Sequence, residues 1–189
     1  MRSFLHAIAF TALVAGCSMT ASAQWSTNPA TNNAICAAGG QFYPTIVSDG
    51  AGGAIITWED RRTGFSDIYA QRINASGVVQ WTADGVAICN SFNGQDTPKI
   101  VSDGAGGAII TWNDRRNGDS NNDVYAQRIN GSGVVQWTPN GVAISNATFD
   151  QVAPTIVGDG AGGAIITWED TRSGVINIYT QRINASGVV

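Results

Sequence analysis

The residues with the clearest chemical potential are an aspartate and an arginine that recur together after a tryptophan. The aspartate follows the tryptophan by two residues, and the arginine follows two residues later. The three pairs are Asp60 and Arg62, Asp114 and Arg116, and Asp170 and Arg172. Two roles fit such pairs. In the first, arginines from several copies bind one carboxylate ligand. In the second, each Asp–Arg pair forms a hydrogen-bond network that holds the strands of its own copy together. Because a catalytic group needs one special position, the recurrence favours the structural network.

The sequence lacks the residues for histidine-dependent catalysis and for a phosphate-binding loop. The only histidine is His6, which lies in the N-terminal leader, so Ser-His-Asp catalysis, Cys-His catalysis and His-ligated zinc are excluded beyond it. The repeated DGAGGA segment lacks the Lys and Ser/Thr of a phosphate loop. We therefore expect no catalytic residue and no cofactor. The alternative is an enzyme that acts on polysaccharides with Asp or Glu pairs, drawn from Glu59, Glu169 and the repeated aspartates.

The loop that varies most among the copies is the predicted site of recognition. In the middle copy it reads NGDSNND and places Asp119, Asn121 and Asp123 at alternate positions, partly like a calcium loop. Val124 replaces the expected glycine and no bidentate glutamate follows, so no metal site is predicted and the trio is an incomplete calcium candidate. Phe65 and Val175 occupy the same loop in the other copies. Variable loops on a constant scaffold commonly carry recognition, so these residues are the predicted binding positions.

The candidate residues belong to a repeat that occurs three times. DGAGGAIITW spans residues 49–58, 103–112 and 159–168, and the copies start at Pro44, Pro98 and Pro154, at spacings of 54 and 56 residues. A period of this size marks a supersecondary unit that stacks on its neighbours. Turn signals divide each copy into four short strands, which in the first copy are PTIVSD, GAIITWED, DIYAQRIN and VVQWTADGVAI, the last interrupted at its Asp-Gly.

Four antiparallel strands per repeat, with an apolar second strand, are typical of a β-propeller blade. The repeats resemble those of secreted bacterial tandem-repeat proteins that carry DGxGGxxxxWxDxR followed by DIYAQR. The resemblance implies a β-propeller and implies little about activity. We expect an all-β, propeller-like protein of about three four-stranded blades that form part of a larger ring. A β-solenoid and a row of β-sandwich modules are the alternatives, although a sandwich usually needs about 100 residues.

The chain divides into an export segment and blades. Residues 1–23 are predicted to be a signal peptide that is cleaved after Ala21-Ser22-Ala23, whereas the alternative, a lipobox at Val14–Cys17, would leave Cys17 lipidated. A partial blade is expected at 24–43, blades at 44–97 and 98–153, and an incomplete blade at 154–189. The N-terminal fourth strand would close a ring on the last three strands, or the chain is a piece of a longer protein, which is the interpretation we favour. The predicted location is secreted or cell-surface.

Composition limits the partners. The chain has 14 acidic and 10 basic residues and a net charge of −4, which argues against binding to nucleic acid and to anionic membranes. A membrane is expected only through the leader or a lipid on Cys17. Cys36 and Cys89 occupy matching places in neighbouring repeats, which are usually too far apart for a disulfide. Two free thiols are therefore expected, with a disulfide as the alternative that export permits.

Three tryptophans, Trp25, Trp81 and Trp137, share a Gln-Trp context. They form either a row for carbohydrate stacking or contacts between blades, and the identical contexts favour contacts. The sequence as a whole predicts an exported, non-catalytic propeller protein that binds an unknown extracellular glycan or protein, or serves as a cell-surface scaffold. A polysaccharide hydrolase or lyase and a purely structural array are the alternatives.

Overall fold

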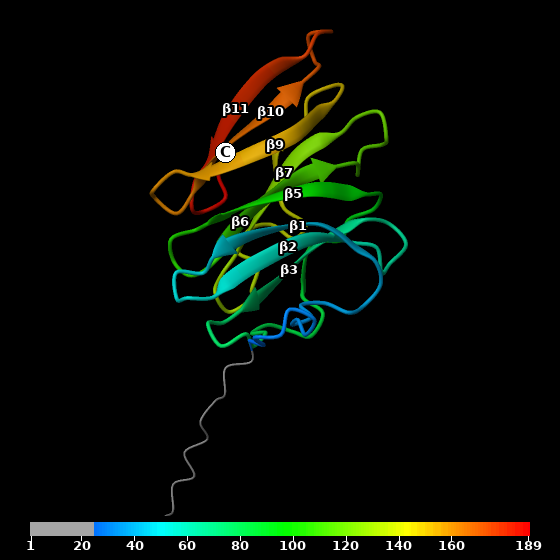
Figure 1. The fold of residues 1–189 in the computed structure, drawn as a ribbon. Helices are drawn as coiled ribbons and strands as arrows, with labels where there is room; N and C mark the ends of the chain where they lie inside the picture. Colours follow the sequence, from blue (N-terminus) through cyan, green and yellow to red (C-terminus); the bar gives the residue numbers. More distant parts are fainter. Residues whose placement is uncertain (1–24) are drawn as a thin grey trace, which may run out of the picture.

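The computed structural model describes residues 25–189, which form strands, turns and loops. Three antiparallel sheets of four, four and three strands follow one another along the chain (Figure 1). Within the described residues the first and third sheets are not paired, so the array does not close into a ring. The predicted all-β, propeller-like fold of three blades in tandem is confirmed. None of the described residues forms a helix that is long and apolar enough to cross a membrane.

Each sheet is a meander whose strands pair in chain order. The first sheet contains β1 (Gln41–Ser48), β2 (Ala54–Asp60), β3 (Asp67–Ile73) and β4 (Val86–Cys89). The second contains β5 (Gln95–Ser102), β6 (Ala108–Asp114), β7 (Asp123–Ile129) and β8 (Val142–Ser145). The third contains β9 (Gln151–Gly158), β10 (Ala164–Asp170) and β11 (Asn177–Ile183), and no described strand covers the outer edge of β11.

The DGAGG segment forms the turn between the first and second strands because its aspartate binds the turn from within. Oδ1 of Asp49 accepts hydrogen bonds of 2.8 Å from the backbone N–H groups of Ala51 and Gly53. Its Oδ2 lies 2.8 Å from Nη2 of Arg72 on β3, which ties the turn to the third strand. The equivalent pairs in the other sheets are Asp103 with Arg128 and Asp159 with Arg182.

The strands differ from the prediction at three places. The first strand begins at Gln41, three residues before Pro44, because a bulge carries the strand past the proline. At this bulge Tyr43 has a φ of 50°. The fourth strand is shorter than predicted: Val79 forms a single bridge to Ile73, and regular pairing resumes only at Val86. Residues 25–40, where a fourth strand was predicted, contain no strand.

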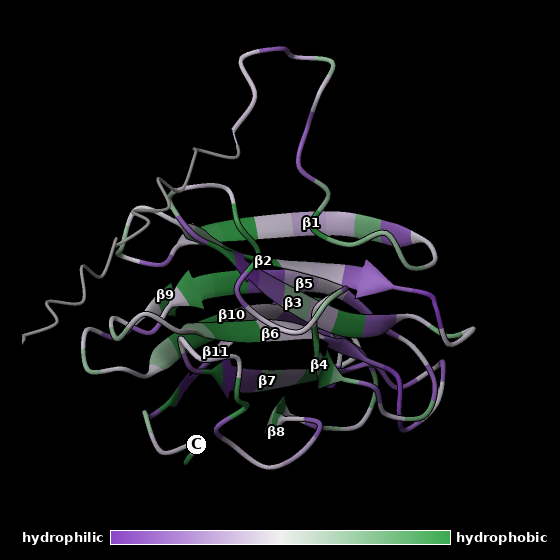
Figure 2. Cartoon of the chain, turned by 90° about the horizontal axis from the view of Figure 1, so that it is seen from below, coloured by the Kyte–Doolittle hydropathy of each residue, from purple (hydrophilic) through white to green (hydrophobic). Residues whose placement is uncertain are grey.

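Neighbouring sheets pack face to face through apolar cores. Ile55 and Ile68 of the first sheet belong to the same buried cluster as Ile110 and Trp112 of the second. An equivalent cluster joins the second sheet to the third, with Ile109, Val124, Ile166 and Trp168 among its members. Hydrophobic residues lie mostly on the strands (Figure 2). The first strands of the sheets, β1, β5 and β9, are neighbours, so the sheets fan out from them.

The Gln-Trp tryptophans connect successive sheets. Nε1 of Trp81 donates to the carbonyl of Gly131 at 3.1 Å, and Nε1 of Trp137 donates to that of Ala185 at 3.1 Å. Both indoles are buried. Trp25 makes the same bond to Ala75, at 2.8 Å, but is half exposed. These tryptophans therefore make the contacts between blades that their shared context predicted.

Candidate functional site

The clearest candidate site is a polar hollow between the first and second sheets, at the end where the second strands finish. Two adjoining hollows of about 400 and 290 Å³ share Arg61, Ser66, Gly94 and Arg115. We call them together the inter-sheet cleft. The polar side chains and the tyrosine that line its larger part are Tyr43, Glu59, Arg61, Ser66, Asp96, Thr97, Asn113 and Arg115.

Glu59 forms one buried wall of the cleft. It is the last residue but one of β2, and it is 1% exposed. Oε1 of Glu59 accepts a 2.9 Å hydrogen bond from the backbone N–H of Thr97 on β5. Burial, with a contribution from the negative charge of Asp96, raises the pKa of Glu59 above its ordinary value, although the bond from Thr97 opposes this. The cleft thus contains a carboxyl group that is protonated more readily than a solvated one.

The opposite wall comes from the second sheet. Nδ2 of Asn113 donates to Oδ1 of Asp96 at 3.0 Å, and Nη2 of Arg115 lies 2.6 Å from Oδ2 of the same carboxylate. Oδ1 of Asn113 is buried and has no hydrogen-bond partner among the described residues. Because an unpaired buried acceptor is costly, this oxygen is suited to receive a hydrogen bond from a ligand or a bound water.

The backbone bulge brings Thr97 to Glu59. Thr97 has a φ of 51°, and its equivalents Tyr43 and Ala153 have values of 50° and 54°. A residue other than glycine is strained in this region by about 1–2 kcal/mol. The bulge is therefore held by its surroundings, and at Thr97 it aims the N–H at the Glu59 carboxylate.

The rim of the cleft carries cations and aromatic rings. The side chains of Arg61 and Arg115 are 52% and 44% exposed. Phe65 and Phe92, both exposed, lie with their ring centroids 6.0 Å apart. Guanidinium donors, a free amide acceptor and exposed rings are together suited to a ligand that carries several hydroxyl or carboxylate groups and an apolar face.

The structure brings two of the predicted binding residues together and separates the others. Phe65 and Asp119 both line the smaller part of the inter-sheet cleft. Asn121 lies in the same loop as Asp119. Val175 is exposed in the loop between β10 and β11, outside the residues that line the cleft. Asp123 is buried on β7, where its Oδ2 accepts a 2.7 Å hydrogen bond from Nδ2 of Asn117.

The calcium candidate is not assembled as a ligand set. Asp119 is exposed whereas Asp123 is buried at the start of β7. Among residues 25–189 there is no group of three His, Cys, Asp or Glu side chains that is placed to hold a metal ion. Both cysteines in the described part of the chain, Cys36 and Cys89, are free thiols, and burial raises the pKa of Cys89 to about 12.

The Asp–Arg pairs lie within the sheets rather than in the cleft. Nε of Arg62 donates to Oδ1 of Asp60 at 2.7 Å, and its Nη2 donates to the carbonyl of Asp84 at 2.8 Å. The guanidinium also stacks over the ring of Tyr69, 4.1 Å from its centroid. Nε1 of Trp58 donates to Oδ2 of the same aspartate at 2.9 Å. Arg116 with Asp114, and Arg172 with Asp170, repeat the ion pair.

Sequence reasoning missed most of the cleft because it compared the copies for what they share. The signal lay in their differences: Asn113 stands where the other copies have Glu59 and Glu169, and Asp96 stands where they have Phe42 and Val152. The third copy also has Thr171 where the others have Arg61 and Arg115. The chain matches no protein-family model, and no curated protein matches its sequence.

Proposed function

We propose that the protein is an exported, non-catalytic binding module whose inter-sheet cleft binds an extracellular glycan. The observation that carries this is the unpaired, buried Oδ1 of Asn113 at the wall of a polar hollow. Half-exposed Arg61 lines the same hollow, and the exposed ring of Phe65 lines the adjoining smaller one, with the ring of Phe92 6.0 Å away from it. Sugars present hydroxyl donors to such an acceptor and an apolar ring face to such aromatics.

Several residues that line the cleft also differ among the three copies. A purely structural array has no reason to combine two arginines, a buried glutamate and an asparagine at one junction only. At the junction of the second and third sheets, Asp150 instead accepts hydrogen bonds from the backbone N–H and the Nδ2 of Asn122. This difference between two otherwise equivalent junctions favours selection for binding at the first.

The test is binding of the purified protein to a glycan array, followed by calorimetry with the best ligand. We expect Arg61→Ala to weaken binding by about 10-fold or more, which is about 1.4 kcal/mol. The matched control is Lys99→Ala, because Lys99 is an exposed cation on β5 that does not line the cleft. Glycan binding that both variants retain in full would contradict the assignment to this cleft, and binding only to a protein ligand would contradict the glycan class.

A polysaccharide hydrolase is the second candidate function. The raised pKa of Glu59 beside Asp96 is the specific observation that favours it, because a general acid needs a carboxyl group that stays protonated. Release of reducing ends from a polysaccharide panel, abolished in Glu59→Gln, would establish the enzyme and overturn the non-catalytic proposal.

Export is proposed from residues 1–23, which lie outside the described residues. Mass spectrometry of the mature N-terminus distinguishes the two routes. Cleavage after Ala23 gives the secreted protein, and a diacylated Cys17 gives a lipid-anchored protein at the cell surface.

A further inference from the structure

Arg61 differs from the other described arginines because no carboxylate lies within hydrogen-bond distance of it. Residues 25–189 contain eight arginines. In seven of them Nη2 lies 2.5–2.9 Å from a carboxylate oxygen, and these are Arg62, Arg72, Arg115, Arg116, Arg128, Arg172 and Arg182. Nη2 of Arg61 lies 3.9 Å from Oε2 of Glu59, which is too far for a hydrogen bond.

The cause is a difference between the copies on the first strand of the sheet. Asp96 on β5 supplies the carboxylate that Arg115 binds at 2.6 Å. Phe42 occupies the equivalent place on β1. The guanidinium of Arg61 lies over this ring instead, with Cζ 4.6 Å from the ring centroid. The face of a ring attracts the positive charge but is not a carboxylate that accepts the in-plane N–H groups, so these donors stay available.

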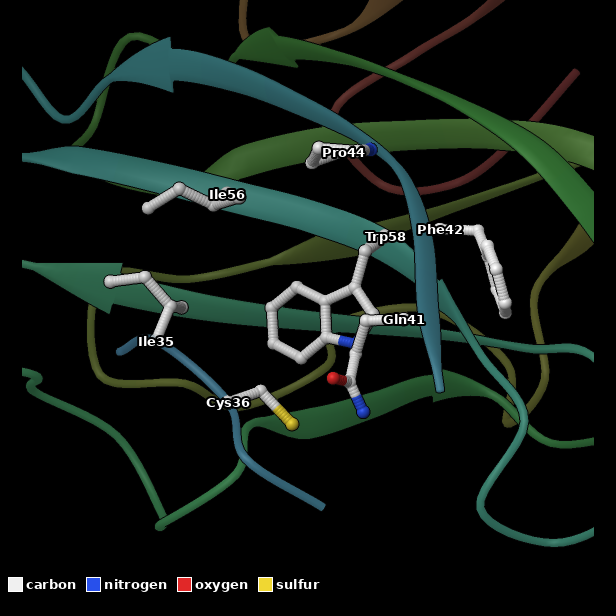
Figure 3. Close-up of a pocket in the computed structure, with 7 residues that line it drawn as sticks. All are labelled: Ile35, Cys36, Gln41, Phe42, Pro44, Ile56 and Trp58. Carbon is white, nitrogen blue, oxygen red and sulfur yellow. The ribbon is translucent and has the colours of Figure 1, made fainter. Parts of the chain in front are cut away.

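The surroundings of Phe42 supply no carboxylate in place of the missing one. Phe42 lines an apolar hollow of about 200 Å³ together with Ile35 and Trp58, and no charged residue lines this hollow (Figure 3). Among the described residues, the one hydrogen bond of the Arg61 side chain runs from Nε to Oγ of Ser66, at 3.1 Å. Ser66 therefore orients the guanidinium, and Nη1 and Nη2 keep their donors for another partner.

These donors are accessible in the inter-sheet cleft. Arg61 lines both of its parts, and its side chain is 52% exposed. The third copy has Thr171 at this position, and Oγ1 of Thr171 donates to the carbonyl of Asp150 at 3.1 Å. A free guanidinium is thus present at one junction and absent from the next.

The charges around Arg61 limit the kind of anion that can bind. Asp96 neutralises Arg115, and Glu59 and Asp119 add negative charge to the walls of the cleft. A ligand with many negative charges would be repelled by these carboxylates and by the net charge of −4 of the whole chain. A single planar carboxylate avoids most of this repulsion, and its two oxygens match the two terminal nitrogens of a guanidinium.

Asn113 adds a requirement for a hydroxyl group. Its Nδ2 donates to Asp96 at 3.0 Å, which fixes the orientation of the amide. Its Oδ1 is buried and has no partner among the described residues. A ligand carboxylate cannot pair with this oxygen because both are acceptors, whereas a hydroxyl group can donate to it. A sugar acid carries both of the groups that Arg61 and Asn113 need.

We propose that the glycan bound in the inter-sheet cleft is acidic, with the carboxylate of a uronic acid accepting hydrogen bonds from Nη1 and Nη2 of Arg61 and a hydroxyl group of the glycan donating to Oδ1 of Asn113. Uronate recognition rests on the glycan-binding function proposed above. Arg61 adds selectivity for the charged sugar, and Asn113 contributes equally to acidic and neutral sugars.

The test compares each acidic glycan with a neutral glycan of the same linkage. The probes are oligomers of galacturonic, glucuronic, mannuronic and guluronic acid, each beside its carboxyl-reduced counterpart, which keeps the ring hydroxyls and loses the charge. Calorimetry with the purified protein at neutral pH measures both affinities of each pair. We expect at least one acidic oligomer to bind about 10-fold or more tightly than its reduced counterpart.

Variants assign this preference to individual residues. Arg61→Gln is expected to bring the ratio of the two affinities close to one, and Arg61→Lys to keep only part of the preference, because lysine retains the charge but lacks the planar fork. Asn113→Leu should weaken acidic and neutral oligomers by the same factor and leave their ratio unchanged. Lys99→Gln, outside the cleft, is the matched control and should bind like the wild type. Circular dichroism checks that each variant is folded.

The outcomes separate the two levels of the proposal. Equal affinity for the acidic and reduced members of every pair would overturn uronate recognition and leave the glycan-binding function standing. A preference for the acidic member that Arg61→Gln retains in full would overturn the role of Arg61. Absence of binding to every glycan of a broad array would overturn the glycan-binding function itself, and uronate recognition with it.

Discussion

Arg116 holds the carboxylate of Asp114 at two points, with Nε 2.7 Å from Oδ1 and Nη2 2.6 Å from Oδ2. The same guanidinium donates to the carbonyl of Asn140 at 2.7 Å and lies 3.8 Å from the ring centroid of Tyr125. One side chain therefore connects the end of β6 to β7 and to the turn before β8. Two-point pairing fixes the geometry as well as the charge, so Arg116 is a structural connection within its sheet.

Asp114→Asn is expected to lower the free energy of unfolding by about 3 kcal/mol, because it leaves a mostly buried guanidinium without its carboxylate. Asp170→Asn should cost less, since Arg172 in the third sheet is more exposed and water can replace part of the lost interaction. Urea unfolding followed by tryptophan fluorescence measures both. Equal costs would contradict the role of burial.

Stability should fall in acid as Asp170 becomes protonated. Burial alone raises its pKa, but the hydrogen bonds from Arg172 and Trp168 outweigh burial and lower the pKa of Asp170 from 3.8 to about 2. A depressed pKa in the folded state stabilises the fold above the unfolded pKa, and this stabilisation is lost as pH falls through the folded one. We expect the unfolding free energy of the wild type to decrease between about pH 4 and pH 2. In that window Asp170→Asn should show a shallower slope, and an identical slope would assign the acid sensitivity to other groups.

Asp123→Asn is expected to stabilise the protein at neutral pH. Burial, together with the negative charge of Asp114, raises the pKa of Asp123. The ionised carboxylate is therefore less favourable in the folded protein than in the unfolded chain, and stability is lost as pH rises above the ordinary value of 3.8. The third sheet already has Asn177 at this position.

Thermal unfolding checks this prediction. Asp123→Asn should melt higher than the wild type at pH 7, and the difference should disappear near pH 3, where both side chains are neutral. A lower melting temperature at pH 7 would mean that the charge of Asp123 supports the fold.

The strands and turns could be predicted from the repeat because they depend on local chemistry, such as Asp49 binding the turn that follows it. The environment of each copy could not. Ile55 and Ile165 occupy the same repeat position, yet one is fully buried and the other is 42% exposed, because only the first has a sheet packed over it. The missing strand at residues 25–40 has the same cause, since a strand forms only beside a partner. The inter-sheet cleft was missed because its walls come from two sheets. Asn113 forms part of a site only because Glu59 of the neighbouring sheet lines the same hollow.

Two glycines in the same turn allow two costs of an added methyl group to be compared. At Gly107 the cost is steric overlap, and at Gly104 it is backbone strain. A Cβ on Gly107 would lie 2.3 Å from the carbonyl oxygen of Ile129, on the adjacent strand. Gly104 has open space around it but a φ of +76°, which costs an alanine about 1–2 kcal/mol. We expect Gly107→Ala to lower the unfolding free energy by about 3 kcal/mol or more, since backbone must shift to admit the methyl group. Gly104→Ala is the matched control and should cost only its conformational strain. Urea unfolding of the two variants decides the point: if Gly104→Ala costs as much as Gly107→Ala, conformation rather than close packing against β7 explains the conserved spacing of the DGAGG turn among the three copies.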